Sequence, residues 1–229
     1  MAMGIRMQGH GSPRHARMHE ARVCQPSALS PILGPSLERL VHASPQALVD
    51  MTRQYGSPLN VVVPGELTRN VDGFRAVLNR HDVRFEILYG AKVNKSPALV
   101  RAAVGAGIGI DVSSLYEMRD ALRAGIDPAR LCATGPAKTR VFHMALVANA
   151  ALISVDSMEE LEDLETIVSE IEPDRPARVL LRYRPQEEQA SRFGMSAVDL
   201  TACMKRLALR SDSFSFEGFH FHLGGYRYE

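Results

Sequence analysis

Apolar runs of strand length alternate with amphipathic stretches of helix length through most of this chain, and that rhythm constrains its fold more than any other feature. Strands separated by helices form βαβ units, which build a parallel sheet. The predicted strands are residues 85–91, 107–112, 130–133, 151–155, 178–183 and 216–223, and amphipathic helices are predicted at 115–124 and 158–169.

The same rhythm fits an open doubly wound sheet or a closed barrel. No Gly-x-Gly-x-x-Gly motif follows the first predicted strand, which argues against a dinucleotide-binding sheet. Polar residues instead follow successive strands, at the end where a (β/α) barrel keeps its active site. We therefore predict an α/β protein with an incomplete (β/α)8 TIM barrel, holding about six of the usual eight strands. The strand-end residues are Lys92, Asn94, Asp111, Thr134, Asp156, Arg182, His220 and His222.

Charge and cysteine content argue against several kinds of partner. Lys and Arg number 27 against 26 Asp and Glu, so no overall field attracts nucleic acid or an anionic membrane. Cys24, Cys132 and Cys203 are widely spaced, which argues against a disulfide framework and a structural zinc site. No apolar stretch reaches the roughly 18 residues of a membrane span. We expect a cytoplasmic protein without a metal, nucleic-acid or membrane partner, and with Cys132 buried on its strand.

Composition divides the chain into three parts. Residues 1–43 are rich in Met, His, Gly, Pro and Arg without a sustained period, which predicts a disordered basic tail, with an organelle transit peptide as the alternative. Residues 44–84 form a lead-in of helices around a short strand at 59–63. Residues 85–229 form the partial barrel, and the acidic residues of its 158–169 helix are expected to face solvent.

Lys92 is the first candidate for chemistry. Gly90 and Lys92 share one face of their strand, because strand side chains alternate. A lysine among apolar strands loses hydration of its ammonium form, which frees the amine to attack a carbonyl and makes Schiff-base chemistry available. The alternative is a lysine that ends a strand and reaches solvent.

Other strand-end residues extend this candidate site. Asp111 is a carboxylate able to orient an imidazole or an amine, or alternatively to cap the helix that follows. A buried Arg182 requires an anion or a phenolate oxygen. His220 and His222 project from one face and precede Gly224-Gly225, a bend that lets backbone amides approach a phosphate.

Seven motifs in one collinear order resemble the ornithine, diaminopimelate and arginine decarboxylases, which depend on pyridoxal 5'-phosphate and share the alanine-racemase-like barrel. The motifs are Tyr89-Gly90-Ala91-Lys92-Val93-Asn94, Gly109-Ile110-Asp111-Val112-Ser113-Ser114, Thr134-Gly135-Pro136-Ala137-Lys138, Val155-Asp156-Ser157, Arg182, Ser191-Arg192-Phe193-Gly194 and Gly218-Phe219-His220-Phe221-His222-Leu223-Gly224.

The resemblance implies a role for each matching residue. Lys92 matches the lysine that holds the cofactor, and His222 matches the imidazole that stacks on the pyridine ring. Asp111 matches the aspartate near both. Arg182 matches the arginine near the phenolic oxygen, and Arg192 matches a basic residue that approaches the partner subunit.

The match departs from the family near the phosphate and at the end of the chain. Gly224 falls in the phosphate turn, but Gly225 stands where many members have serine, so backbone amides must replace one hydroxyl contact. The later glycine-rich loop, the glutamate for the pyridine nitrogen and the β-domain are expected beyond Glu229. We therefore expect a truncated or split form of a homodimeric decarboxylase, with weak or no turnover on its small-molecule partner, an amino acid.

Three alternatives remain open. An amino-acid racemase would use the same cofactor, and the deciding residues lie outside the sequence. A non-catalytic barrel for cofactor homeostasis would need no β-domain, although the strand at 59–63 favours the decarboxylase. A hydrolase would use His220 and His222 as a metal pair.

Overall fold

The computed structural model describes residues 33–185 and 191–222, and all the elements below belong to one compact unit, Gly34–Glu229. The strands are β1 (Leu88–Gly90), β2 (Gly109–Val112), β3 (Leu131–Ala133), β4 (Leu152–Val155), β5 (Ala177–Arg182) and β6 (Phe214–His220). The helices are α1 (Pro35–Ala43), α2 (Pro45–Tyr55), α3 (Pro64–Arg80), α4 (Pro97–Gly105), α5 (Leu115–Arg123), α6 (Arg140–Ala148), α7 (Met158–Ile171) and α8 (Ala197–Ala208), with a 3-10 turn η1 (Pro128–Arg130) before β3.

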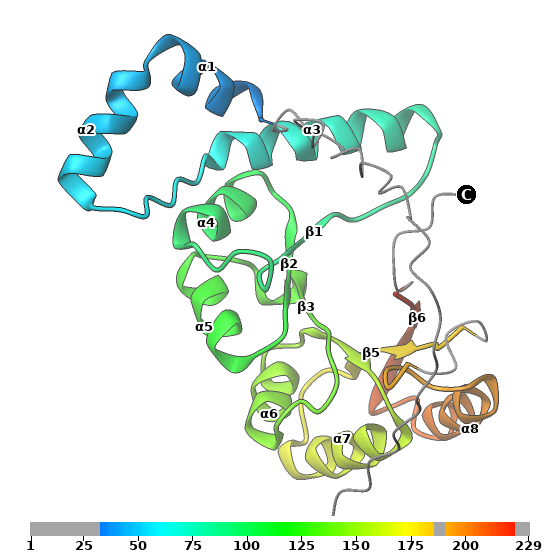
Figure 1. Ribbon diagram of the computed structural model, residues 1–229. Helices are drawn as coiled ribbons and strands as arrows, with labels where there is room; N and C mark the ends of the chain where they lie inside the picture. Colours follow the sequence, from blue (N-terminus) through cyan, green and yellow to red (C-terminus); the bar gives the residue numbers. More distant parts are fainter. Residues whose placement is uncertain (1–32, 186–190, 223–229) are drawn as a thin grey trace, which may run out of the picture. The chain divides into compact units, whose positions relative to one another are not determined.

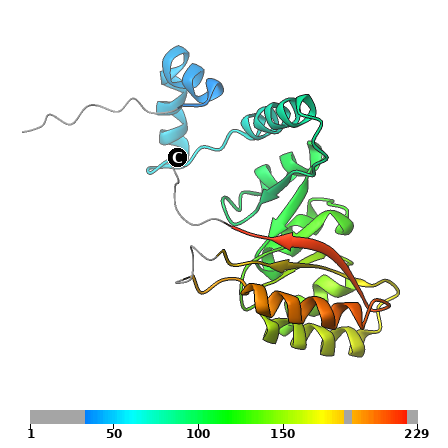
Figure 2. The same ribbon diagram turned by 90° about the vertical axis from the view of Figure 1, so that its right-hand side faces the viewer.

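The six strands form one parallel sheet in the order β1-β2-β3-β4-β5-β6, which confirms the predicted fold class. Each strand pairs with the next along the chain, as in a barrel opened between its last and first strands. Helices α4 to α8 follow the strands around the outer face of the sheet (Figure 1). The turned view shows α7 and α8 stacked beside β5 and β6 (Figure 2).

Two predictions about the first part of the chain are wrong. Helix α1 lies within the range predicted as a disordered tail, while the rest of that tail, residues 1–32, lies outside the described residues. Residues 59–63 form no strand, although Val61 and Val62 have strand propensity. A strand needs a neighbour to satisfy its backbone groups, and no strand among the described residues pairs with this segment.

Strand and helix bounds also shift where pairing or caps override the apolar pattern. The first strand begins at Leu88 rather than 85, since β2 begins only at Gly109 and offers no further partner upstream. Helix α3 begins at Pro64, directly after the segment predicted as a strand, because a proline at the first helical position loses no hydrogen bond.

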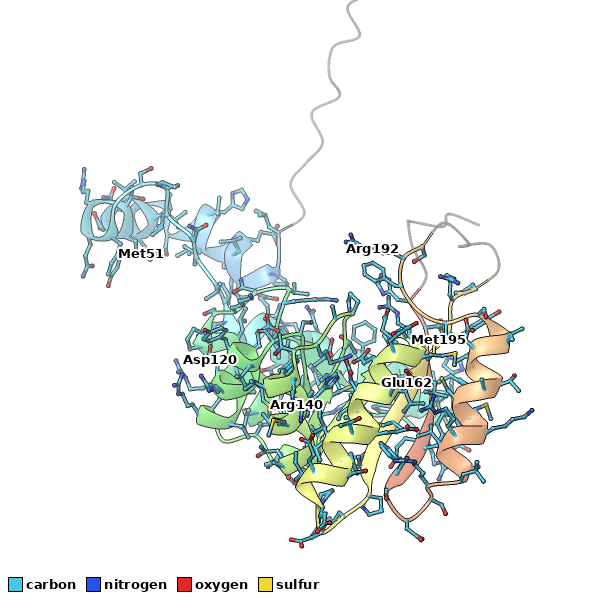
Figure 3. The ribbon with its side chains drawn as sticks, turned by 90° about the horizontal axis from the view of Figure 1, so that it is seen from below. Met51, Asp120, Arg140, Glu162, Arg192 and Met195 are labelled. Atoms are coloured by element: carbon cyan, nitrogen blue, oxygen red, sulfur yellow. The ribbon has the colours of Figure 1, made fainter. Side chains whose placement is uncertain are left out.

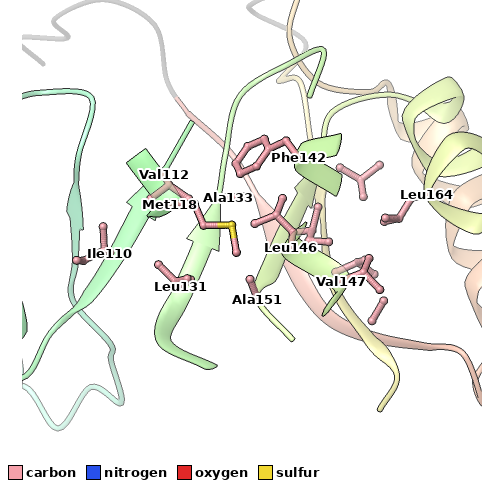
Figure 4. Close-up of a cluster of buried hydrophobic side chains, with 14 of the residues drawn as sticks. Ile110, Val112, Met118, Leu131, Ala133, Phe142, Leu146, Val147, Ala151 and Leu164 are labelled. Carbon is pink, nitrogen blue, oxygen red and sulfur yellow. The ribbon is translucent and has the colours of Figure 1, made fainter. Parts of the chain in front are cut away.

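The core fills the space between the outer face of the sheet and its helices (Figure 4). Alternate strand residues, such as Ile110, Ile153 and Leu181, are completely buried against helices. Helices α5 and α6 contribute Met118 and Leu146 to the same layer. The opposite face of the sheet is therefore free to carry polar side chains at its carboxyl end. None of the helices in the described ranges combines the length and apolar character needed to cross a membrane.

A bulge in β6 decides which residues of this strand face that inner side. Val179 pairs with Phe216 and Leu180 pairs with Gly218, so the register skips Glu217. Gly218 has a φ of +136°, a backbone conformation that residues with a side chain rarely adopt. The extra residue reverses the alternation and brings His220 beside Arg182.

Candidate functional site

Lys92 lies just beyond the end of β1. Gly90 ends that strand and pairs with Asp111 of β2, while Lys92 follows in the turn and is exposed. The described residues therefore do not desolvate the amine, contrary to the expectation from the apolar strands. Exposure leaves the amine accessible to a ligand, and its positive charge acts on the Asp111 carboxylate.

Asp111 carries an unsatisfied atom at this end of the sheet. Its Oδ2 accepts a hydrogen bond from Thr134 Oγ1 at 2.9 Å, whereas its buried Oδ1 has no partner among the described residues. Burial raises the pKa of Asp111, although the Thr134 hydrogen bond and the Lys92 charge oppose that effect. The capping alternative is wrong, because Ser114 caps α5 by accepting from Glu117 N.

Arg182 forms an ion pair with a carboxylate of the same chain, that of Asp156. Its Nη1 donates to Asp156 Oδ1 at 2.7 Å, and both side chains are buried. The guanidinium carbon lies 4.8 Å from the centre of the Phe193 ring, and Asp156 Oδ2 accepts from Gly194 N at 3.1 Å. Gly194 has a φ of +77°, and a Cβ there would lie 3.1 Å from the Tyr183 backbone. The Ser191–Gly194 motif therefore packs on Arg182.

Arg192, in the same motif, is exposed, with its guanidinium carbon 4.9 Å from the Phe193 ring. It lies with Met195 on the segment that joins β5 to α8 (Figure 3). A cavity of about 270 Å³ opens beside it, lined by Asp156, Arg184 and the first residues of α7 and α8.

The two histidines differ in environment. His220 Nδ1 lies 2.6 Å from Ser154 Oγ, and burial together with the Arg182 charge lowers the pKa of His220 to about 4. β6 ends at His220, so the predicted strand does not reach His222, which is exposed. Gly224 and Gly225 lie outside the described residues. No group of three or more potential metal ligands occurs in residues 33–185 and 191–222.

A buried cluster formed by Lys138, His143 and Glu160, which we did not predict from the sequence, contacts the main chain at the end of β4. Lys138 Nζ donates to Glu160 Oε1 at 2.6 Å, and the same oxygen lies 2.9 Å from His143 Nε2. Glu160 and Glu165 were expected on a solvated helix face, but both are buried because each has a cationic partner, Lys138 or Arg206. Cys132 is buried as predicted.

The arrangement fits a pyridoxal cofactor better than a metal or a dinucleotide. An accessible amine after β1, a buried carboxylate oxygen without a partner on β2 and a neutral imidazole on β6 all lie toward the carboxyl end of one barrel sheet. Lys92 and Asp111 would hold such a group at the carboxyl ends of β1 and β2, and Arg182 and His220 lie at the carboxyl ends of β5 and β6 in the same sheet. These features define the class of pyridoxal-binding barrels with the alanine-racemase-like fold.

Residues 65–227 match the family model described as "Pyridoxal-dependent decarboxylase, pyridoxal binding domain". The chain belongs to this family, which confirms the resemblance read from the seven motifs and identifies pyridoxal phosphate as the family cofactor. The chain is 48% identical over 202 residues to a Sinorhizobium fredii protein named "Uncharacterized protein y4yA", a match that covers 88% of this chain and 43% of that protein.

Diaminopimelate decarboxylases are further relatives. The Zymomonas mobilis enzyme is 27% identical over 190 residues, covering 77% of this chain and 44% of that enzyme. The chain therefore spans a little under half the length of the curated relatives it matches.

Solved structures of the same fold include the diaminopimelate decarboxylase of M. jannaschii in complex with L-lysine. It superposes with a TM-score of 0.68 at 21% identity, covering 77% of this chain and 44% of that one. The arginine decarboxylase of Paramecium bursaria Chlorella virus gives a TM-score of 0.65 at 15% identity, covering 80% and 49%. At these identities the likeness shows the fold, and its partial coverage matches the incomplete barrel.

Proposed function

We propose that this chain contributes the cofactor-binding half of an amino-acid decarboxylase, a lyase in which Lys92 holds pyridoxal phosphate. The observation that carries the proposal is the buried Asp111 Oδ1 without a partner, beside an accessible lysine amine. A buried acceptor left unpaired is costly unless a ligand uses it. When bound, the cofactor delocalises the electron pair left on Cα when a bond to that carbon breaks.

The residues of this chain would bind the cofactor and orient it. The Lys92 amine would hold the cofactor through its aldehyde carbon, and Gly90 would leave room beside it because it has no side chain. Asp111 accepts a hydrogen bond or receives a positive charge at Oδ1. Arg182, whose Nη1 donates to Asp156 Oδ1, has further N–H groups that would donate to the phenolic oxygen. His222 would stack on the pyridine ring, as the family match implies.

The remaining assignments follow the family. Backbone amides at Gly224 and Gly225, which lie outside the described residues, would bind the phosphate, and the substrate is an amino acid. We further propose that the whole protein is a cytoplasmic homodimer and that the division into 1–43, 44–84 and 85–229 describes its organisation, with α1 as an ordered end of the first part. Turnover requires elements beyond the barrel half.

Reduction with borohydride tests the lysine assignment. Cofactor is added to the folded chain, the sample is reduced and digested, and the labelled peptide is mapped. We expect the label on Lys92 and none in Lys92→Ala, while Lys205→Ala, which removes an exposed lysine of α8, keeps full labelling. An unlabelled Lys92 in a folded sample would overturn the proposal.

Carbon dioxide release tests the reaction. The whole protein is incubated with diaminopimelate, ornithine, arginine or lysine, and we expect release from one of them. Loss of optical activity without release would identify a racemase instead. Cofactor binding with neither outcome would identify a binding protein.

A further inference from the structure

Lys138 is the most completely buried cation among the described residues that form ion pairs, with 1% of its side chain exposed. Its ammonium group has three N–H donors, and each has an acceptor. Glu160 Oε1 lies at 2.6 Å, the Ser154 backbone oxygen at 2.6 Å and the Gly135 backbone oxygen at 2.8 Å. Lys138 therefore joins the loop after β3, the strand β4 and the helix α7.

Glu160 makes the second connection to the end of β4. Its Oε2 accepts from the Asp156 backbone N–H at 2.8 Å, while Ser157 Oγ accepts from the Glu160 backbone N–H at 3.1 Å. The carboxylate thus holds a main-chain atom two residues beyond the one that Lys138 holds. Burial raises the pKa of Glu160, but the His143 hydrogen bond and the Lys138 charge more than offset it, so the net pKa of Glu160 is lowered and its carboxylate stays ionised.

The two residues held in this way carry the side chains of the site. Ser154 and Asp156 share one face of β4, since strand side chains alternate. Ser154 Oγ contacts His220 Nδ1 at 2.6 Å, and Asp156 Oδ1 accepts from Arg182 at 2.7 Å. Within the described residues, neither Lys138 nor Glu160 forms a hydrogen bond with His220 or Arg182.

We propose that Lys138 and Glu160 are positioning residues that fix the end of β4, and through Ser154 and Asp156 fix His220 and Arg182 toward the cofactor. The part that concerns the cofactor rests on the proposed function. A buried ion pair contributes little net stability compared with apolar residues of the same volume, because desolvation offsets its attraction. Its value here lies in the two main-chain atoms that it holds, which an apolar pair could not bind.

The test replaces the pair without leaving a buried charge alone. Lys138→Met with Glu160→Gln removes the ammonium donors, and glutamine has one acceptor oxygen where the carboxylate has two, so either the His143 ring or the Asp156 backbone N–H loses its oxygen acceptor. The matched control is Arg206→Met with Glu165→Gln, which breaks another ion pair of α7, one whose contacts run to α8.

Two signals of the full chain without cofactor report on positioning. We expect the Gly194 amide, which donates to Asp156 Oδ2, to exchange about tenfold faster in the Lys138 double variant, the loss of about one hydrogen bond. We also expect the ring ¹⁵N signals of His220 to move, because its contact with Ser154 loosens. Both signals stay at their wild-type values in the control.

Cofactor affinity gives the third measurement, with an expected weakening of about tenfold in the double variant and none in the control. Unchanged Gly194 exchange and His220 signals in a folded double variant would overturn the inference. Absence of cofactor binding to the wild-type chain would count against the proposed function alone, since the first two signals need no cofactor. Should the double variant not fold, Lys138→Arg takes its place, which keeps the charge but lengthens the side chain, and the same signals decide.

Discussion

Replacing Asp111 with asparagine should stabilise the fold while damaging the site. The side chain is buried enough that its pKa is raised above the ordinary value of 3.8, and one of its oxygens has no partner among the described residues. Thr134 Oγ1 can still donate to the amide oxygen of an asparagine. The substitution therefore removes a poorly solvated charge and retains its existing hydrogen bond.

The sign follows from proton linkage. A raised pKa means that the folded chain binds the proton more tightly than the unfolded chain, so the stability contribution falls as the pH rises through the folded pKa. At pH 7 the ionised carboxylate therefore destabilises the fold. A neutral buried group without a partner costs about 1–3 kcal/mol and a charged one costs more, so the asparagine amide is less costly here than the carboxylate, and the Lys92 charge reduces the difference. We expect Asp111→Asn to gain about 1 kcal/mol at pH 7, or about 2–4 °C in Tm.

Urea denaturation at pH 7 and near pH 3.8 measures the effect. The gain should be present at pH 7 and should shrink toward the lower pH, where Asp111 becomes protonated. Asp120→Asn is the control, because Asp120 pairs with Arg123 on the exposed face of α5 (Figure 3), and its change should remain within about 0.5 kcal/mol. A less stable Asp111→Asn at pH 7, or a gain that is equal at both pH values, would refute the reasoning.

Three further predictions concern the scaffold. Ile153→Ala empties a completely buried position in β4 and should cost about 2–5 kcal/mol by urea denaturation, and a loss under 1 kcal/mol would show that the core relaxes there. Ser114→Ala removes the acceptor for Glu117 N and should cost about 1 kcal/mol in thermal unfolding, whereas an unchanged Tm would mean that the cap is redundant. Burial raises the pKa of Glu160, but its hydrogen bond with His143 and the neighbouring lysine charge bring the pKa below 4.5, so this stability is present above pH 4.5 and is lost as the pH falls through the lowered pKa. Acid unfolding of Glu160→Gln should consequently be less steep than that of wild type, and identical curves would contradict the assignment.

The sequence predicted the sheet because strand existence depends on local apolar pattern. All six predicted strands of the barrel occur, and residues of β2, β3, β4 and β5 are buried in the core. The segment 59–63 had the same local character but no partner strand among the described residues, and pattern alone carries no information about partners. The bulge at Glu217 could not be predicted from the sequence either, because it depends on how β6 pairs with β5.

Strand-end position predicted which side chains gather but not which contacts they make. Arg182 was expected to need an anion, and Asp156 was named as a strand-end residue, yet only the fold joins them. Ser154 was missed, although its alternation with Asp156 placed it on the same face.

The buried cluster of Lys138, His143 and Glu160 could not be predicted from the sequence pattern. Glu160 sits in an acidic run that resembles a solvated helix face, and Lys138 sits in a loop where lysine is ordinarily exposed. Each is buried because the other is there, so the burial of either residue depends on a contact 22 positions away along the chain. When a charged residue is buried because it pairs with a distant residue, the periodic pattern of the sequence around it does not show the burial. The supports of a site are for this reason harder to find in a sequence than the residues that they hold.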